Sequence, residues 1–107
     1  MGTSLRDLQY LLEKVLRCER VDAGKHIKYY LKVNGRVVAQ THYSHSWRGN
    51  TQIDNSMVSM QAKEMRCSAK TWRLLLEGKV PKEVYFNELF QNGYVSQEEF
   101  DDLCKKR

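Results

Sequence analysis

Proline, paired cysteines and long apolar runs are all scarce in this sequence of 107 residues. No apolar run approaches the ~20 residues that a membrane-spanning helix requires, so we expect no membrane partner. The first residues lack the basic, apolar and small-residue succession of a signal peptide. We therefore expect a cytoplasmic protein, and a composition of 41% hydrophobic and 29% charged residues is typical of a globular domain.

Metal-binding patterns are missing as well. The three cysteines, Cys18, Cys67 and Cys104, form no C-x-x-C pair, so they favour three reduced thiols over a zinc site. The histidines match no usual zinc spacing and have no carboxylates close to them in the sequence. No glycine-rich phosphate loop is present. We expect neither a metal ion nor a cofactor.

Positive charge, by contrast, is gathered in two blocks. The net charge is +5. Residues 17–36 and 63–82 each carry six basic and two acidic side chains, which gives +4 in each block. Residues 83–107 carry three basic and six acidic side chains, which gives −3, and the rest of the chain is neutral. Basic blocks attract phosphate backbones without sequence specificity, although ordinary solvated surface is the alternative.

The apolar periodicities predict a single α+β domain over residues 1–107. A leucine stripe predicts a helix over residues 4–18. Two β-rich runs, residues 26–33 and 36–43, flank Asn34-Gly35, which is a strong hairpin signal. A third short strand near Val21 is left open. We expect a small antiparallel sheet with helices on one face, and the other face free for a ligand.

Helices are expected to follow the hairpin. The first runs to about residue 65 after a cap at Asp54 or Asn55, and Ser68 caps the next one. Residues 80–105 are interpreted as additional C-terminal helices, with Pro81 at a first helical position. Ser96 and Glu99 form a capping box for the last helix.

A turn of two residues at Asn34-Gly35 sets which hairpin side chains share a face. In that register one face carries polar and aromatic side chains, namely His26, Lys28, Tyr30, Lys32, Thr41 and Tyr43. Lysines suit phosphate, tyrosines suit stacking or hydroxyl contacts, and a histidine suits proton transfer. His42 falls on the opposite face and is expected to be a half-buried sheet residue. An ordinary surface histidine is the alternative for His26.

The loop after the hairpin adds further candidates. Trp47, beside Arg48, either stacks on a base or folds back on the core, and the role of His45 is left open. The candidate catalytic residue is His26. The candidate RNA-binding residues are Lys25, Lys28, Tyr30, Lys32, Arg36, Tyr43, His45, Trp47 and Arg48.

Three short motifs occur in a familiar order. They are Leu11-Leu12-Glu13-Lys14 in the first helix, Gly24-Lys25-His26 before a strand, and Ser44-His45-Ser46 between the last strand and a helix. Over residues 4–76 the chain resembles the HicA-type toxins, which cut messenger RNA. The family usually has serine where Lys25 stands, and the chain continues for about 30 residues beyond Leu76.

The resemblance implies a fold like the double-stranded-RNA-binding domain and a metal-independent ribonuclease. It places the catalytic histidine on His26, as general acid or base for attack by a 2′-hydroxyl. Lys25 or Lys28 would stabilise the charged phosphorane. A histidine suits this role because imidazole changes its protonation state near neutral pH.

Three functions are compatible with the sequence. The first, which we favour, is a HicA-like ribonuclease whose partners are RNA and a cognate antitoxin or other protein. The second is a non-catalytic module that binds nucleic acid or a ribonucleoprotein, for example a phage-encoded inhibitor or a regulatory protein. The third is a domain whose basic blocks dock an acidic protein partner. The sequence sets no oligomeric state.

Overall fold

The protein is described by a computed structural model that covers residues 3–106. Its strands are β1 (Thr3–Ser4), β2 (Glu19–Ala23), β3 (His26–Val33), β4 (Arg36–Ser44) and β5 (Gln52–Ile53). Its helices are α1 (Leu5–Tyr10), which continues as the π-helical segment η1 (Leu11–Val15), α2 (Asn55–Glu64), α3 (Ala69–Leu76), α4 (Lys82–Gln91) and α5 (Gln97–Lys106). The predicted α+β class is confirmed, and the third strand is present as β2.

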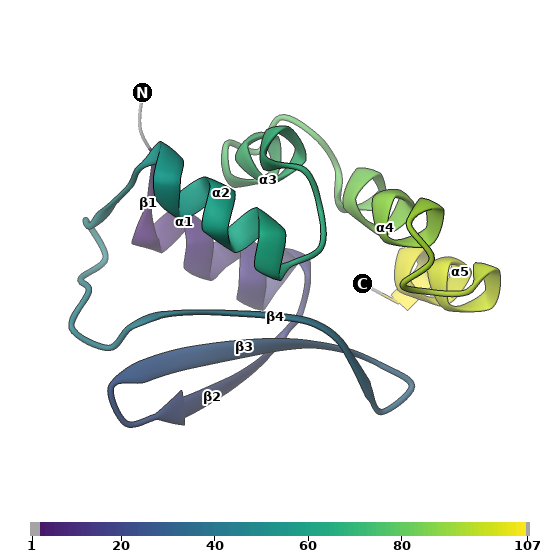
Figure 1. The fold of residues 1–107 in the computed structure, drawn as a ribbon, viewed down its shortest axis with the longest axis horizontal. Coiled ribbons are helices and arrows are strands. Elements are labelled where there is room, and N and C mark those ends of the chain that lie inside the picture. Colours follow the sequence, from purple (N-terminus) through teal and green to yellow (C-terminus); the bar gives the residue numbers. More distant parts are fainter. Residues whose placement is uncertain (1–2, 107) are drawn as a thin grey trace.

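The main sheet is antiparallel, in the order β2-β3-β4, and β1 pairs with β5 in a second, two-stranded sheet. Figure 1 shows α1 and α2 on one side of the main sheet. Strand β3 alternates between exposed and buried residues, as a strand with one solvated face must. The predicted hairpin turn is confirmed, because Asn34 (φ 53°) and Gly35 (φ 78°) take the two positive values of a type I′ turn.

The predicted register holds only close to this turn. Lys32 pairs with Val37 as expected, but Leu31 then pairs with Ala39. Val38 is therefore an extra residue in β4, which is a β-bulge. Because side chains alternate along a strand, one extra residue turns the rest of β4 over.

The bulge corrects the predicted ligand face. Thr41 and Tyr43 were expected beside His26, but they point into the core and are only 2% and 3% exposed. His42 was expected on the core side, but it lies opposite Lys28 on the solvated side. The predicted face of these three β4 residues is wrong, since no local sequence pattern marks the bulge, but His42 is a half-buried sheet residue as expected.

The core lies between the buried face of the sheet and the helices. The first helix supplies a leucine stripe, consisting of Leu5, Leu8, Leu11, Leu12 and Leu16. Helices α2 and α3 meet at Trp72, whose Nε1 donates to Gln61 Oε1 at 3.0 Å inside the core. The same hydrophobic core extends to Leu89 and Leu103 in the C-terminal helices.

The C-terminal helices lie near the hairpin turn (Figure 1). There Arg36 donates to both carboxylate oxygens of Glu99 at 2.7 Å and to the Tyr94 carbonyl at 3.3 Å. The predicted capping box is confirmed, because Ser96 and Glu99 exchange hydrogen bonds of 2.8 and 3.1 Å. Pro81 is the N-cap of α4 with extended backbone, so its prediction as the first helical residue is wrong. Among the described residues no helix is long and apolar enough to span a membrane.

Candidate functional site

A groove of about 780 Å³ runs along β4, beside the C-terminal end of α2. Its volume falls in the usual range of ligand sites. Polar and charged side chains line much of it: His26, Lys28, Gln40, Thr41, His42, Lys63, Glu64 and Arg66. Val37, Val38 and Ala39 form its apolar part. Three cations thus face a single carboxylate, which makes the groove a suitable place for an anionic ligand.

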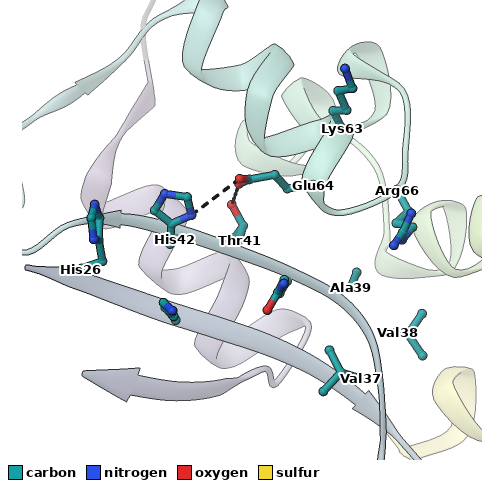
Figure 2. Close-up of a pocket in the computed structure, with 11 residues that line it drawn as sticks. His26, Val37, Val38, Ala39, Thr41, His42, Lys63, Glu64 and Arg66 are labelled. Atoms are coloured by element: carbon teal, nitrogen blue, oxygen red, sulfur yellow. Dashed lines mark hydrogen bonds and ion pairs between the residues drawn. The ribbon is translucent and has the colours of Figure 1, made fainter. Parts of the chain in front are cut away.

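Two histidines meet at one end of the groove. His26 begins β3, and its imidazole lies 5.0 Å from that of His42, centroid to centroid, in an edge-on arrangement. Figure 2 shows both side chains rising from the same face of the hairpin. His42 pairs with Lys28, two residues along β3 from His26, so the histidines are diagonal neighbours across the two strands. The bulge at Val38 is what brings them together.

Glu64, the last residue of α2, reaches across the edge of β4. Its carboxylate accepts a hydrogen bond of 2.7 Å from Thr41 Oγ1, and its second oxygen lies 3.6 Å from His42 Nδ1 (Figure 2). Thr41 is buried, so it holds the carboxylate in place from below. A carboxylate beside Nδ1 favours the tautomer protonated at Nδ1, which leaves Nε2 to accept a proton.

Three cations line the groove at different points along it, and Arg66 lies beside Val38 and Ala39, away from the two histidines (Figure 2). Lys28 and Lys63 are exposed, and neither has an ion-pair partner among residues 3–106. Arg66 follows α2 with a φ of 65°, and its guanidinium lies 4.8 Å above the Tyr94 ring. This left-handed conformation ends α2, because the Arg66 N–H donates to the Lys63 carbonyl at 3.3 Å and the Cys67 N–H donates to the Ala62 carbonyl at 3.0 Å.

The predicted RNA-binding residues divide between the two ends of the sheet. Lys28 and Tyr30 lie on the solvated face, and Lys28 lines the groove. Lys25 occupies the β2–β3 turn, where its carbonyl accepts from the backbone N–H of His45 at 2.8 Å. His45 is thus anchored at the histidine end without lining the groove. Arg36 lies at the opposite end and is bound to α5.

The remaining candidates lie away from the groove. Lys32 forms an ion pair with Glu19 of β2. Tyr43 is a core residue whose ring stacks on Trp47 with centroids 5.8 Å apart. Trp47 therefore takes the second predicted role, as a loop residue folded back on the core. Arg48 is exposed in the loop, where its backbone N–H donates to Thr51 Oγ1 at 2.9 Å.

The buried face of the same sheet has its own polar contacts. The Tyr29 hydroxyl donates to the carboxylate of Glu13, which also lies 3.5 Å from Arg20. Burial, followed by this hydrogen bond, raises the pKa of Tyr29 well above its ordinary value. The Tyr43 hydroxyl accepts from Gln9 at 3.0 Å. These contacts join the first helix to the sheet.

Sequence reasoning missed His42 and Glu64 as site residues. The sequence contains no signal for the bulge that turns His42 outward, and Glu64 is 22 residues away from it along the chain. Lys63 and Arg66 were noticed only as members of the second basic block. That block was the one signal that pointed to this side of the groove.

Metal and thiol chemistry find no support in the described part of the chain. Within residues 3–106 no group of three or more histidine, cysteine or acidic side chains is placed to hold a metal ion. The three cysteines are free and partly buried, as expected. Burial raises the pKa of Cys67 to about 12, and it also raises the pKa of Cys104. Thiols of this kind are poor nucleophiles at neutral pH.

No family model, curated protein or solved structure matches this chain. The resemblance to HicA-type toxins therefore stays a prediction. Function has to be argued from the chemistry of the groove, because one fold can carry many activities.

Proposed function

We propose that the protein binds RNA in the groove along β4 and cleaves it without a metal ion, as a HicA-like ribonuclease. His26 acts as a general acid or base in this reaction. The observation that carries the proposal is the pair of imidazoles, His26 and His42, 5.0 Å apart at the end of a cationic groove. Imidazole is the side chain best suited to proton transfer near neutral pH.

Binding follows from the charges along the groove. Lys28, Lys63 and Arg66 attract the phosphates, and the groove focuses this field on its floor. Tyr30 is half-buried on the same face of β3 and offers its ring and hydroxyl to a base or sugar. These contacts position the strand without reading its sequence.

The reaction uses a group that RNA itself provides. The 2′-hydroxyl attacks the neighbouring phosphate, and an imidazole moves the proton. Charge builds up on the phosphorane, where Lys28 is the nearest groove-lining cation along β3 from His26. No step of this chemistry requires a metal ion.

The order of the elements supports the same proposal. The first helix, the strands β2 to β4 and α2 follow one another as in the order that the resemblance implies. Gly24 and Lys25 form the turn, and His26 is the first residue of β3, where the family's catalytic histidine is expected. A cognate antitoxin is the protein partner that this resemblance would imply.

A non-catalytic RNA-binding module is the second candidate. Lys28 and Lys63 have no ion-pair partner within residues 3–106, and this favours it, since cations alone are enough to hold a phosphate backbone. In that case His26 would have no role beyond the surface it occupies. The two candidates differ only in whether RNA is cut.

The test is cleavage of a mixed messenger-RNA substrate by the purified protein in EDTA. Wild type is compared with His26→Ala and with His45→Ala, a matched control because His45 is an exposed histidine at the same end of the sheet but outside the groove. We expect wild type and His45→Ala to cut, and His26→Ala to lose about 10²- to 10⁴-fold in rate while still binding RNA. If wild type binds RNA but does not cut it, the enzyme proposal is wrong and the binding module stands.

A further inference from the structure

We infer that His42 is a second proton-transfer residue of this site and that Glu64 positions it. The inference rests on the proposed ribonuclease function. It adds a residue that lies outside the three motifs of the resemblance. The observations that carry it are the His26–His42 contact and the carboxylate fixed beside His42 Nδ1.

Concerted acid–base catalysis of this reaction uses two proton-transfer groups. The attacking 2′-hydroxyl must lose a proton, while the leaving 5′-oxygen must gain one. One group has to be unprotonated and the other protonated at the same moment. The groove contains two imidazoles within reach of one phosphate, so each can take one of these tasks.

The surroundings of the two rings assign the roles. His42 Nδ1 faces the Glu64 carboxylate at 3.6 Å, and that carboxylate is fixed by Thr41 Oγ1 at 2.7 Å. A carboxylate in this place orients an imidazole and stabilises the imidazolium that forms when the ring accepts a proton. His26 has no such carboxylate among the described groove residues. His42 is therefore the base and His26 the acid.

The step then balances. His42 Nε2 accepts the proton of the 2′-hydroxyl, and the bond between the 2′-oxygen and phosphorus forms. The bond between phosphorus and the 5′-oxygen breaks, and the imidazolium of His26 gives its proton to that oxygen. The products carry a 2′,3′-cyclic phosphate and a 5′-hydroxyl. DNA, which has no 2′-hydroxyl, is bound but not cut.

The first experiment compares single-turnover cleavage by wild type, His26→Ala and His42→Ala. We expect each groove variant to lose about 10²- to 10⁴-fold in rate, with RNA affinity kept. End-group analysis of the wild-type products should find cyclic phosphates. If wild type cuts no RNA, the proposed function itself fails. If wild type cuts and His26→Ala does not, but His42→Ala cuts at the wild-type rate, only this inference is overturned.

A modified substrate separates the acid from the base. An RNA with sulfur in place of the 5′-bridging oxygen has a leaving group that needs no proton. On this substrate the rate of His26→Ala should return toward that of wild type, whereas His42→Ala should stay slow. The reverse pattern would overturn the assignment of the two roles.

Glu64 and Thr41 test the positioning. Glu64→Gln keeps the shape of the side chain and should lower kcat roughly 10- to 100-fold with little change in KM. Thr41→Val should act in the same direction, and Thr41→Ser, which restores the hydroxyl, should recover the rate.

Nitrogen-15 NMR of the imidazoles gives a readout that does not require RNA. We expect the Nδ1-protonated tautomer of His42 in wild type and its loss in Glu64→Gln. If Glu64→Gln keeps both that tautomer and the wild-type kcat, Glu64 is only a structural contact between α2 and β4.

Discussion

The two faces of the hairpin use the same kind of contact for opposite purposes. On the buried face a carboxylate, Glu13, holds the hydroxyl of Tyr29. On the solvated face another carboxylate, Glu64, lies beside the imidazole of His42. Tyr29 is fully buried, whereas 40% of the His42 side chain is exposed. The two carboxylates are similarly exposed, at 34% and 30%, so the difference lies in their partners: the tyrosine is part of the core, whereas the imidazole opens onto the groove.

The largest expected effect on stability distinguishes two neighbouring residues of β3, one on each face of the sheet. Tyr29→Ala should lower the free energy of unfolding by about 3–5 kcal/mol, because a large buried side chain leaves a cavity. Lys28→Ala, one residue away on the exposed face, should change it by less than about 0.5 kcal/mol. Urea unfolding measures both. The effect on RNA affinity should differ from the effect on stability, because Lys28→Ala, which hardly changes stability, should weaken RNA binding.

Tyr29→Phe is the control for this experiment, since it keeps the ring and removes only the hydroxyl that binds Glu13. A loss of about 1–3 kcal/mol is expected, because the carboxylate is left without this donor. If Lys28→Ala destabilised the protein as much as Tyr29→Ala, the division of the sheet into a structural and a functional face would be wrong.

Features that depend on adjacent residues could be predicted from the sequence. Asn34-Gly35 specifies a tight hairpin turn, and Ser96 with Glu99 specifies a helix start, since each is stabilised within a few residues. His26 became the candidate catalytic residue on a local pattern of the same kind, because it follows Gly24-Lys25 and begins a strand.

The candidate site could be predicted only in part, because it depends on packing between distant segments. The bulge at Val38 lies in an apolar stretch, where no residue type marks an extra position. That one residue decides whether His42 faces the core or the groove. The approach of Glu64 to His42 requires α2 to pack beside β4, which no local pattern specifies.

The next effect concerns the end of the sheet away from the histidines. Hydrogen bonds from the Ser96 backbone and then from Arg36 lower the pKa of Glu99. A depressed pKa in the folded state adds stability above the ordinary value of 4.5, and that stability is lost as the pH falls through the folded value. Glu99→Gln should therefore cost about 1 kcal/mol or less near pH 7. Its difference from wild type should vanish in acid.

Urea unfolding at neutral and acidic pH checks this, with Arg36→Gln as the companion variant. Because Arg36 is paired with the chain's own acidic helix, we expect Arg36→Gln to leave RNA affinity almost unchanged. A strong loss of RNA affinity in Arg36→Gln would mean that RNA displaces α5 from the hairpin, and the functional surface would then extend along the whole exposed face.

Arg66→Gly is also expected to have only a small effect on stability, and it tests whether the groove side of the hairpin is the functional one. Arg66 has a φ of 65°, so glycine removes a conformational cost of about 1–2 kcal/mol. The contact with the Tyr94 ring is lost at about 0.5–1 kcal/mol. The free energy of unfolding should thus change by about 1 kcal/mol or less, while one phosphate contact disappears. The magnitude of the slope of log RNA affinity against log salt concentration should fall by about 0.7–1.

Arg17→Gly is the matched control, since Arg17 also has positive φ but lies outside the groove. A salt slope lowered equally by Arg17→Gly would show that RNA does not bind through the groove in particular.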